Sequence, residues 1–125
     1  MHPRNLVAIR LAALTYEEGW LEGNAERIGR CLHPKLAKRT IKRDADTGEK
    51  YFIHLTKEDL VPHTSEGGGT DVPRDKIYYK VDVLDVFDDV AVVRAESYPH
   101  IDYLQFVKDE PHSDAIGWLT IPAEP

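Results

Sequence analysis

The sequence contains very little of what marks several large classes of protein. Its 125 residues include a single cysteine, Cys31, so neither a disulfide framework nor a cysteine zinc site can be built from it. Cys31 stands among apolar residues, and we interpret it as a small buried hydrophobic side chain, not a nucleophile. A chain with so little cysteine suits a reducing compartment, and we expect a cytoplasmic protein.

The sequence also shows no long apolar run and no signal-peptide pattern. No apolar stretch approaches the roughly 20 residues of a membrane-spanning helix. Residues 1–5 lead directly into a helical pattern that carries charges, which is not the pattern of a signal peptide. We therefore expect no membrane association.

An excess of positive charge is absent as well. The chain has 16 Lys and Arg against 22 Asp and Glu, a net charge of −6, which argues against a nucleic-acid-binding surface. One basic cluster interrupts this balance, and its alternation along a predicted strand indicates a solvated face. The cluster comprises Lys35, Lys38, Arg39, Lys42 and Arg43.

Repeats and low-complexity segments are missing too, and what remains is an ordinary globular composition. The chain is 42% hydrophobic and 30% charged, as expected for a folded domain. Its length suits one core and not two, so we predict a single domain over residues 1–125. The one glycine run, in residues 65–70, lacks the lysine and following helix of a phosphate-binding loop, and we expect no cofactor.

The first third of the chain has helical spacing. Residues 5–22 predict one helix, ended by Gly23. Residues 25–32 predict a second helix, capped by Asn24 and stopped before Pro34. On the first helix the predicted buried face comprises Leu6, Ile9, Ala13, Tyr16, Trp20 and Leu21, and the polar face Arg10, Glu17 and Glu18.

The rest of the chain reads mostly as strands. We predict them at residues 36–42, 51–55, 77–87, 90–98, 101–108 and 115–121, with a short helix after Thr56. Helices must cover one face of such a sheet. The order therefore predicts an α+β fold, in which a curved antiparallel sheet wraps over the N-terminal helices and encloses one apolar pocket.

Several of these stretches resemble a known superfamily. The motifs YEEGWLEGN (residues 16–24) and LHPKLAKR (residues 32–39) are similar to the helical half of nuclear-transport-factor-2-like proteins, and residues 83–87 and 102–104 are similar to their strands. This superfamily includes SnoaL-like and ketosteroid-isomerase-like proteins. The resemblance is closest to its small bacterial branch labelled "putative lumazine-binding" and covers roughly residues 5–108. It implies a cone-shaped, cystatin-like fold.

The end of the chain departs from the superfamily's pattern. Trp118 is present, but Leu119-Thr120-Ile121-Pro122 follows where relatives usually continue a long strand. The connection over residues 109–114 also looks longer. We therefore expect the closing wall of the cone to be less complete than in relatives.

The resemblance further implies a polar pair inside the pocket. In ketosteroid-isomerase-like members, a helix tyrosine and a strand carboxylic acid donate hydrogen bonds to a developing oxyanion. Tyr16 and Asp102 match these two positions. The family's general base, a carboxylate early in the first strand, falls near Thr40, and a threonine cannot abstract a carbon-bound proton at neutral pH. The nearest acid, Asp44, is predicted to lie in or near a turn.

Five further side chains are candidates for contacts with a bound molecule: Trp20, His33, His54, His100 and Trp118. Each also has a plainer reading, since the tryptophans can be core residues and His33 can cap a helix end. His100 and Asp102 share a strand face if the alternation survives Pro99. A third metal ligand is not identifiable, so we predict no metal site.

Three functional hypotheses stay open. The first, which the missing base favours, is a domain that binds a small apolar or aromatic molecule of unknown identity. The second is a small isomerase, cyclase or dehydratase acting on a cyclic or polyketide-like substrate, with Asp102 as acid or base and Tyr16 as oxyanion donor. The third is an interaction module that forms a homodimer through the outer face of the sheet, which would bury residues such as Tyr78 or Val92.

Overall fold

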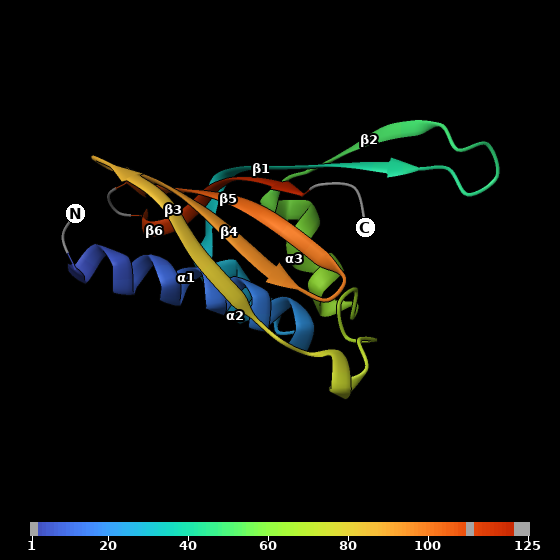
Figure 1. Cartoon of the computed structure of the whole chain (residues 1–125), viewed down its shortest axis with the longest axis horizontal. Helices are drawn as coiled ribbons and strands as arrows, with labels where there is room; N and C mark the ends of the chain where they lie inside the picture. Colours follow the sequence, from blue (N-terminus) through green and yellow to red (C-terminus); the bar gives the residue numbers. More distant parts are fainter. Residues whose placement is uncertain (1–2, 110–111, 122–125) are drawn as a thin grey trace.

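The fold is a layer of helices against one curved sheet (Figure 1). The computed structural model describes residues 3–109 and 112–121, and the side chains of residues 6–108. The helical elements are α1 (Pro3–Glu22), α2 (Ala25–Cys31), α3 (Lys57–Ser65) and the 3-10 turn η1 (Arg74–Lys76). The strands are β1 (Leu32–Arg43), β2 (Lys50–Leu55), β3 (Lys80–Phe87), β4 (Val90–Ser97), β5 (His100–Asp109) and β6 (His112–Ile121).

The sheet has six strands in the order β2-β1-β6-β5-β4-β3. Every neighbouring pair is antiparallel except β1 and β6, which run parallel. The helices α1, α2 and α3 lie on the same face of this sheet, and the β1–β2 hairpin extends beyond them (Figure 1). The prediction of helices packed under a curved, largely antiparallel sheet is confirmed.

The helical hairpin follows the expected signals at its turn. Gly23 adopts φ +69°, a left-handed conformation that glycine tolerates and that ends α1. The side chain of Asn24 then accepts a hydrogen bond from the backbone N–H of Arg27 and caps α2. The second helix ends at Cys31, and the strand β1 begins at Leu32 without a loop, so β1 starts four residues earlier than predicted.

In the second half of the chain, a turn and a helix cap also form at residues that favour them. Asp88 has φ +52° between β3 and β4, as the predicted hairpin turn at Asp88-Asp89 requires. Thr56 and Asp59 form a complete capping box at the start of α3. The strand β3 begins at Lys80, three residues later than predicted, since its pairing with β4 starts at Lys80 opposite Glu96. The turn η1 over residues 74–76 precedes it.

An apolar core fills the space between α1, α2 and the middle of the sheet. Its members include Ile9, Ala13, Ile28, Leu32, Leu36, Leu60, Val93, Leu104 and Phe106. Cys31 belongs to this core, where its thiol donates to the carbonyl of Ile28 at 3.0 Å. Burial raises the pKa of Cys31 to about 12, so at neutral pH it is the packed thiol that the sequence predicted and not a thiolate nucleophile.

The described helices give no membrane anchor. Among residues 3–109 and 112–121, none of the helices is both long enough and apolar enough to cross a membrane.

Candidate functional site

A pocket of about 430 Å³ lies between the C-terminal half of α1 and the sheet. Its floor is more polar than the apolar interior that the sequence predicted around Tyr16 and Asp102. Its wall comes from α1, the strands β1, β2 and β5, and two connections of the chain. The floor consists of Tyr16, Glu17, Lys38, Thr40, Ser97 and Asp102, and the wall includes Trp20, Leu21, Ile53, Leu55, Gly68, Gly69 and His100.

Tyr16 and Lys38 form one half of the floor. The ammonium Nζ of Lys38 donates a hydrogen bond to the hydroxyl of Tyr16 at 3.3 Å, and it lies 5.4 Å from the ring centroid of Trp20. Burial, and next to it the charge of Asp102, raises the pKa of Tyr16 well above its ordinary value. Tyr16 therefore keeps its proton and can donate it to an oxygen in the pocket.

Glu17 and Asp102 form the other half. Ser97 Oγ donates to Glu17 Oε2 at 2.9 Å, while Glu17 Oε1 and Asp102 Oδ1 are buried and have no donor among the described residues. Burial, the charge of Asp102 and the contact between the two carboxyl groups raise the pKa of Glu17 well above its ordinary value. Glu17 therefore keeps its proton over a wider pH range than an exposed glutamate does, next to the buried carboxyl group of Asp102.

Two residues of this floor were assigned to solvent from the sequence, and that assignment is wrong. Glu17, predicted on the polar face of the first helix, is only 2% exposed, and Lys38, predicted on a solvated strand face, is only 8% exposed. Glu17 follows Ala13 by four residues and precedes Trp20 by three, so helical spacing already put it on the inner face. Lys38 follows buried Leu36 by two residues, which puts both on the same face of a strand.

The glycine run over residues 67–69 forms a seat for Trp20. A Cβ atom placed on Gly68 would lie 2.6 Å from Cη2 of the Trp20 ring, and one placed on Gly69 would lie 2.7 Å from the Trp20 carbonyl oxygen. Only glycine allows so close an approach. The glycine run therefore holds an aromatic wall of the pocket in place.

The structure brings only part of the predicted site together. Tyr16, Trp20, His100 and Asp102 all line the pocket. His54 is exposed on β2 and lies on the opposite face from Ile53 and Leu55, whose side chains line the pocket, because neighbours along a strand alternate.

The two remaining candidates lie elsewhere. His33 is on β1, where its Nδ1 accepts from the backbone N–H of Lys35 at 3.0 Å, and it is not among the residues that line the pocket. The backbone of Trp118 pairs with Ala37 in β6, but its side chain lies outside the described residues. The predicted stop at Pro122 lies outside them as well.

The position expected for a general base carries none. Thr40 lines the pocket between Lys38 and Lys42, so this stretch of β1 contributes no carboxylate. Asp44 is exposed, and its Oδ1 accepts from the backbone N–H groups of Asp46 and Thr47. These bonds lower the pKa of Asp44, which therefore stabilises a turn outside the pocket.

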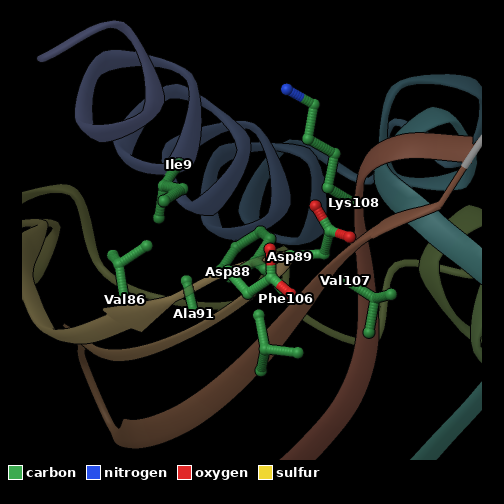
Figure 2. Close-up of a pocket in the computed structure, with 9 residues that line it drawn as sticks. Ile9, Val86, Asp88, Asp89, Ala91, Phe106, Val107 and Lys108 are labelled. Atoms are coloured by element: carbon green, nitrogen blue, oxygen red, sulfur yellow. The ribbon is translucent and has the colours of Figure 1, made fainter. Parts of the chain in front are cut away.

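A second, much smaller hollow lies at the other end of α1. Its volume is about 30 Å³, room for a single water molecule. Ile9 comes from α1, Val86 from β3, Ala91 from β4 and Phe106 from β5 (Figure 2). Asp88, Asp89 and Lys108 line its outer edge (Figure 2), and at this volume the hollow is not a candidate site.

No metal site was found in the described part of the chain. Its His, Cys, Asp and Glu side chains form no group of three that could hold a metal ion.

Comparisons with known proteins agree with this architecture. Residues 4–112 match the protein family described as "Putative lumazine-binding". No curated protein matches the chain.

Several solved structures have the same fold. An NTF-2 like protein of unknown function from Silicibacter pomeroyi DSS-3 is 17% identical, with 97% of this chain and 98% of that chain covered and a TM-score of 0.72. A ketosteroid isomerase-like protein from Erwinia carotovora atroseptica SCRI1043 is 12% identical, with 98% of both chains covered and a TM-score of 0.61. A domain of unknown function with a cystatin-like fold from Nostoc punctiforme PCC 73102 is 14% identical, with 98% and 78% covered and a TM-score of 0.59. At these identities the likeness shows the fold alone.

Proposed function

Because the chain belongs to the protein family described as "Putative lumazine-binding", within the nuclear-transport-factor-2-like superfamily, we propose that it binds one small cyclic molecule in the pocket between α1 and the sheet. The pocket's volume of about 430 Å³ is in the usual range for small-molecule sites. The ligand is a ring compound that carries oxygen at its inner end.

The observation that carries this proposal is the buried polar floor. Tyr16, Glu17, Lys38 and Asp102 are all buried in a fold whose core is otherwise apolar. Burying so many ionisable groups costs stability, so the fold alone gives no reason for them. A ligand that accepts from Tyr16 or Lys38 would give these groups the partner that bulk water provides elsewhere.

The wall of the pocket supports a cyclic ligand. Trp20 is held by the glycine run, and Leu21, Ile53 and Leu55 add apolar surface. An aromatic side chain favours flat rings that stack on it or meet its edge. Lumazine, the compound in the family's description, is a flat two-ring heterocycle with two carbonyl groups and is the first probe to try.

The test is equilibrium binding by calorimetry and thermal shift, with lumazine, cyclic ketones and hydroxylated aromatics as probes. We expect at least one probe to bind, and Asp102→Asn to weaken it by about tenfold or more, about 1.4 kcal/mol. The matched control is Asp85→Asn, an exposed position on β3. The proposal fails if no probe binds, or if both variants weaken binding equally.

A second candidate function is acid–base catalysis in the same pocket, and the Glu17–Asp102 pair favours it. Two carboxyl groups that hold one proton supply an acid and a base side by side, which makes good the base that Thr40 does not provide. Tyr16 would then stabilise an enolate oxygen. The reaction class is isomerisation, cyclisation or dehydration of a cyclic or polyketide-like carbonyl compound.

The assay for this second function is exchange of the α-hydrogens of cyclic ketones with deuterated water, followed by NMR. We expect exchange above the uncatalysed rate, with a loss of about a hundredfold in Glu17→Gln. Binding without any enhanced exchange would leave the first function and exclude the second for these ketones.

A further inference from the structure

We propose that Lys38 attacks the carbonyl carbon of an aldehyde or ketone in this pocket and holds it as a covalent imine. The inference rests on the proposed function, since the pocket must admit the compound, and it names the substrate class. Nothing in the family description or in the similar structures assigns a role to this lysine.

The first argument is the placement of the amine. Lys38 is 8% exposed, and its side chain lines the floor of the pocket. The other pocket lysine, Lys42, lies four positions further along β1 and is more exposed. A carbonyl compound bound in the pocket can therefore meet the buried amine of Lys38 beside the hydroxyl of Tyr16 and the ring of Trp20.

The second argument is the lack of a carboxylate held against that amine. Buried lysines with a structural role are ordinarily paired with an acid. Among the residues that the structure describes, Lys38 forms no ion pair with Glu17 or Asp102, and the hydrogen-bond partner of its Nζ is the neutral hydroxyl of Tyr16. This arrangement leaves the nitrogen lone pair available once the proton is lost.

The third argument is the charge state that such chemistry needs. An amine attacks a carbonyl only in its neutral form. Burial lowers the pKa of Lys38, while the charges of Asp102 and Glu17 act in the opposite direction without cancelling it. Lysines on the solvated surface have no comparable desolvation, so Lys38 holds more neutral amine than they do near neutral pH.

The fourth argument is the proton relay beside it. The lone pair of Nζ forms the carbon–nitrogen bond, and the carbonyl electron pair moves to the oxygen, which receives a proton from the floor. The nitrogen then loses one proton to a water molecule in the pocket, which passes it to the carboxyl groups of Glu17 and Asp102. The same pair returns a proton to the hydroxyl group, which leaves as water.

These steps conserve atoms, protons and charge. A carbonyl compound, one neutral amine and one proton give one protonated imine and one water, with no oxidant or reductant. Tyr16 lies 3.3 Å from the amine nitrogen and is placed to hydrogen-bond the carbonyl oxygen while the new bond forms.

The experiment traps the imine by reduction. The full-length protein is incubated near neutral pH with benzaldehyde or cyclohexanone and sodium cyanoborohydride, then digested and mapped by mass spectrometry. We expect the alkyl group on Lys38 at about ten times the yield of any surface lysine or more, since each unit of lowered pKa gives tenfold more neutral amine. The α-amino group reacts as well because of its low pKa, and its peptide is distinct in the map.

Two variants accompany the wild type. Lys38→Arg keeps a buried cation but cannot form an imine, and we expect it to remove the dominant label. Lys35→Arg changes an exposed lysine on the same strand and should leave the labelling at Lys38 unchanged. If Lys38→Arg does not fold, the ratio of labels within the wild type still decides the question.

The outcomes separate this inference from the proposed function. Dominant labelling at Lys38 supports it. Equal labelling of all lysines overturns it, and so does a probe that binds by calorimetry but is not trapped at Lys38, in which case the binding function stands. A protein that binds none of the probes and traps none of them contradicts both.

Discussion

The two ends of the space beneath the sheet share α1, β4 and β5 and differ in character. At the N-terminal end of α1, Ile9 packs toward Ala91 and Phe106 and leaves a hollow of about 30 Å³ (Figure 2). At the other end, about two turns further along α1, Tyr16 and Glu17 face a pocket of about 430 Å³.

The strand β5 repeats this division. Leu104 and Phe106 are buried in the apolar core, and Asp102, on the same face of the strand, belongs to the polar floor. The apolar end stabilises the fold by burial, whereas the polar end carries ionisable groups whose burial costs free energy. Stability and ligand recognition therefore depend on opposite ends of α1 and β5.

The largest expected effect is at the apolar end. Phe106→Ala removes a buried aromatic ring, and we expect the free energy of unfolding to fall by about 3–5 kcal/mol. Urea unfolding measures this. A loss below about 1 kcal/mol would contradict the assignment of this end to stability.

The next effect has the opposite sign and lies at the polar end. Lys38→Met replaces a buried amine by an apolar side chain of similar length, and we expect a gain of about 1–4 kcal/mol in the free energy of unfolding. The same variant should lose binding of the probes. A destabilised Lys38→Met protein would show that this lysine serves the fold.

The third largest effect is expected at the glycine run that packs against Trp20. Gly68→Ala places a Cβ atom 2.6 Å from the Trp20 ring, and we expect a cost of about 1–3 kcal/mol from overpacking together with weaker probe binding. The control is Gly29→Ala, whose Cβ would meet Val61 at an ordinary 3.8 Å. Tryptophan fluorescence, in a background with Trp118→Phe, should change in the first variant only.

The titration of Glu17 gives the fourth prediction. Its folded-state pKa is raised above an ordinary value of 4.5 by burial and by Asp102. Below pH 4.5, Glu17 holds its proton in both the folded and the unfolded protein. Above it the unfolded chain releases the proton and the folded protein keeps it, so the free energy of unfolding falls as pH rises, by up to about 1.4 kcal/mol per pH unit, until the folded-state pKa is passed.

Glu17→Gln cannot titrate and should remove this decline. Urea midpoints between about pH 4 and pH 8 check it, with the exposed Glu26→Gln on α2 as control. Parallel pH profiles for Glu17→Gln and wild type would contradict the buried, protonated state of Glu17.

A substitution on the outer face of the sheet is expected to have the smallest effect on the free energy of unfolding and on probe binding. We propose that the homodimer forms there, and that Val92→Glu weakens it while leaving probe binding and the free energy of unfolding of the subunit nearly unchanged. Tyr78, also exposed, donates to Glu96 on the same strand as Val92 at 2.9 Å. Sedimentation at several concentrations measures the assembly, and a strictly monomeric wild type would end the proposal.

Local signals in the sequence predicted the elements well. Gly23, Asn24 and Thr56 mark helix ends by their backbone conformation and side-chain bonds, and these effects act within a few residues. The parallel pairing of β1 with β6 was not predicted, because the partner of a strand depends on contacts between residues far apart in the chain.

Only two of the four buried ionisable residues of the polar floor were predicted, and the reason differs from that for the strand pairing. Tyr16 and Asp102 were found through the family resemblance, but Glu17 and Lys38 were assigned to water because of their charge. Their spacing relative to Ala13 and Leu36 already placed them inside. When charge and periodicity disagree at one position, the conflict itself indicates a functional residue.

The central claim is that small molecules enter the polar end and not the apolar one. The direct measurement is an NMR titration of the isotope-labelled protein with the probe that binds best, following each backbone amide. The account predicts shifts concentrated in residues 16–20, 38–42, 67–72 and 97–102, which line the large pocket or flank it, with residues 86–91 and 106–108 unmoved. Shifts concentrated around residues 86–91 and 106–108, or on the outer face of the sheet, would contradict it.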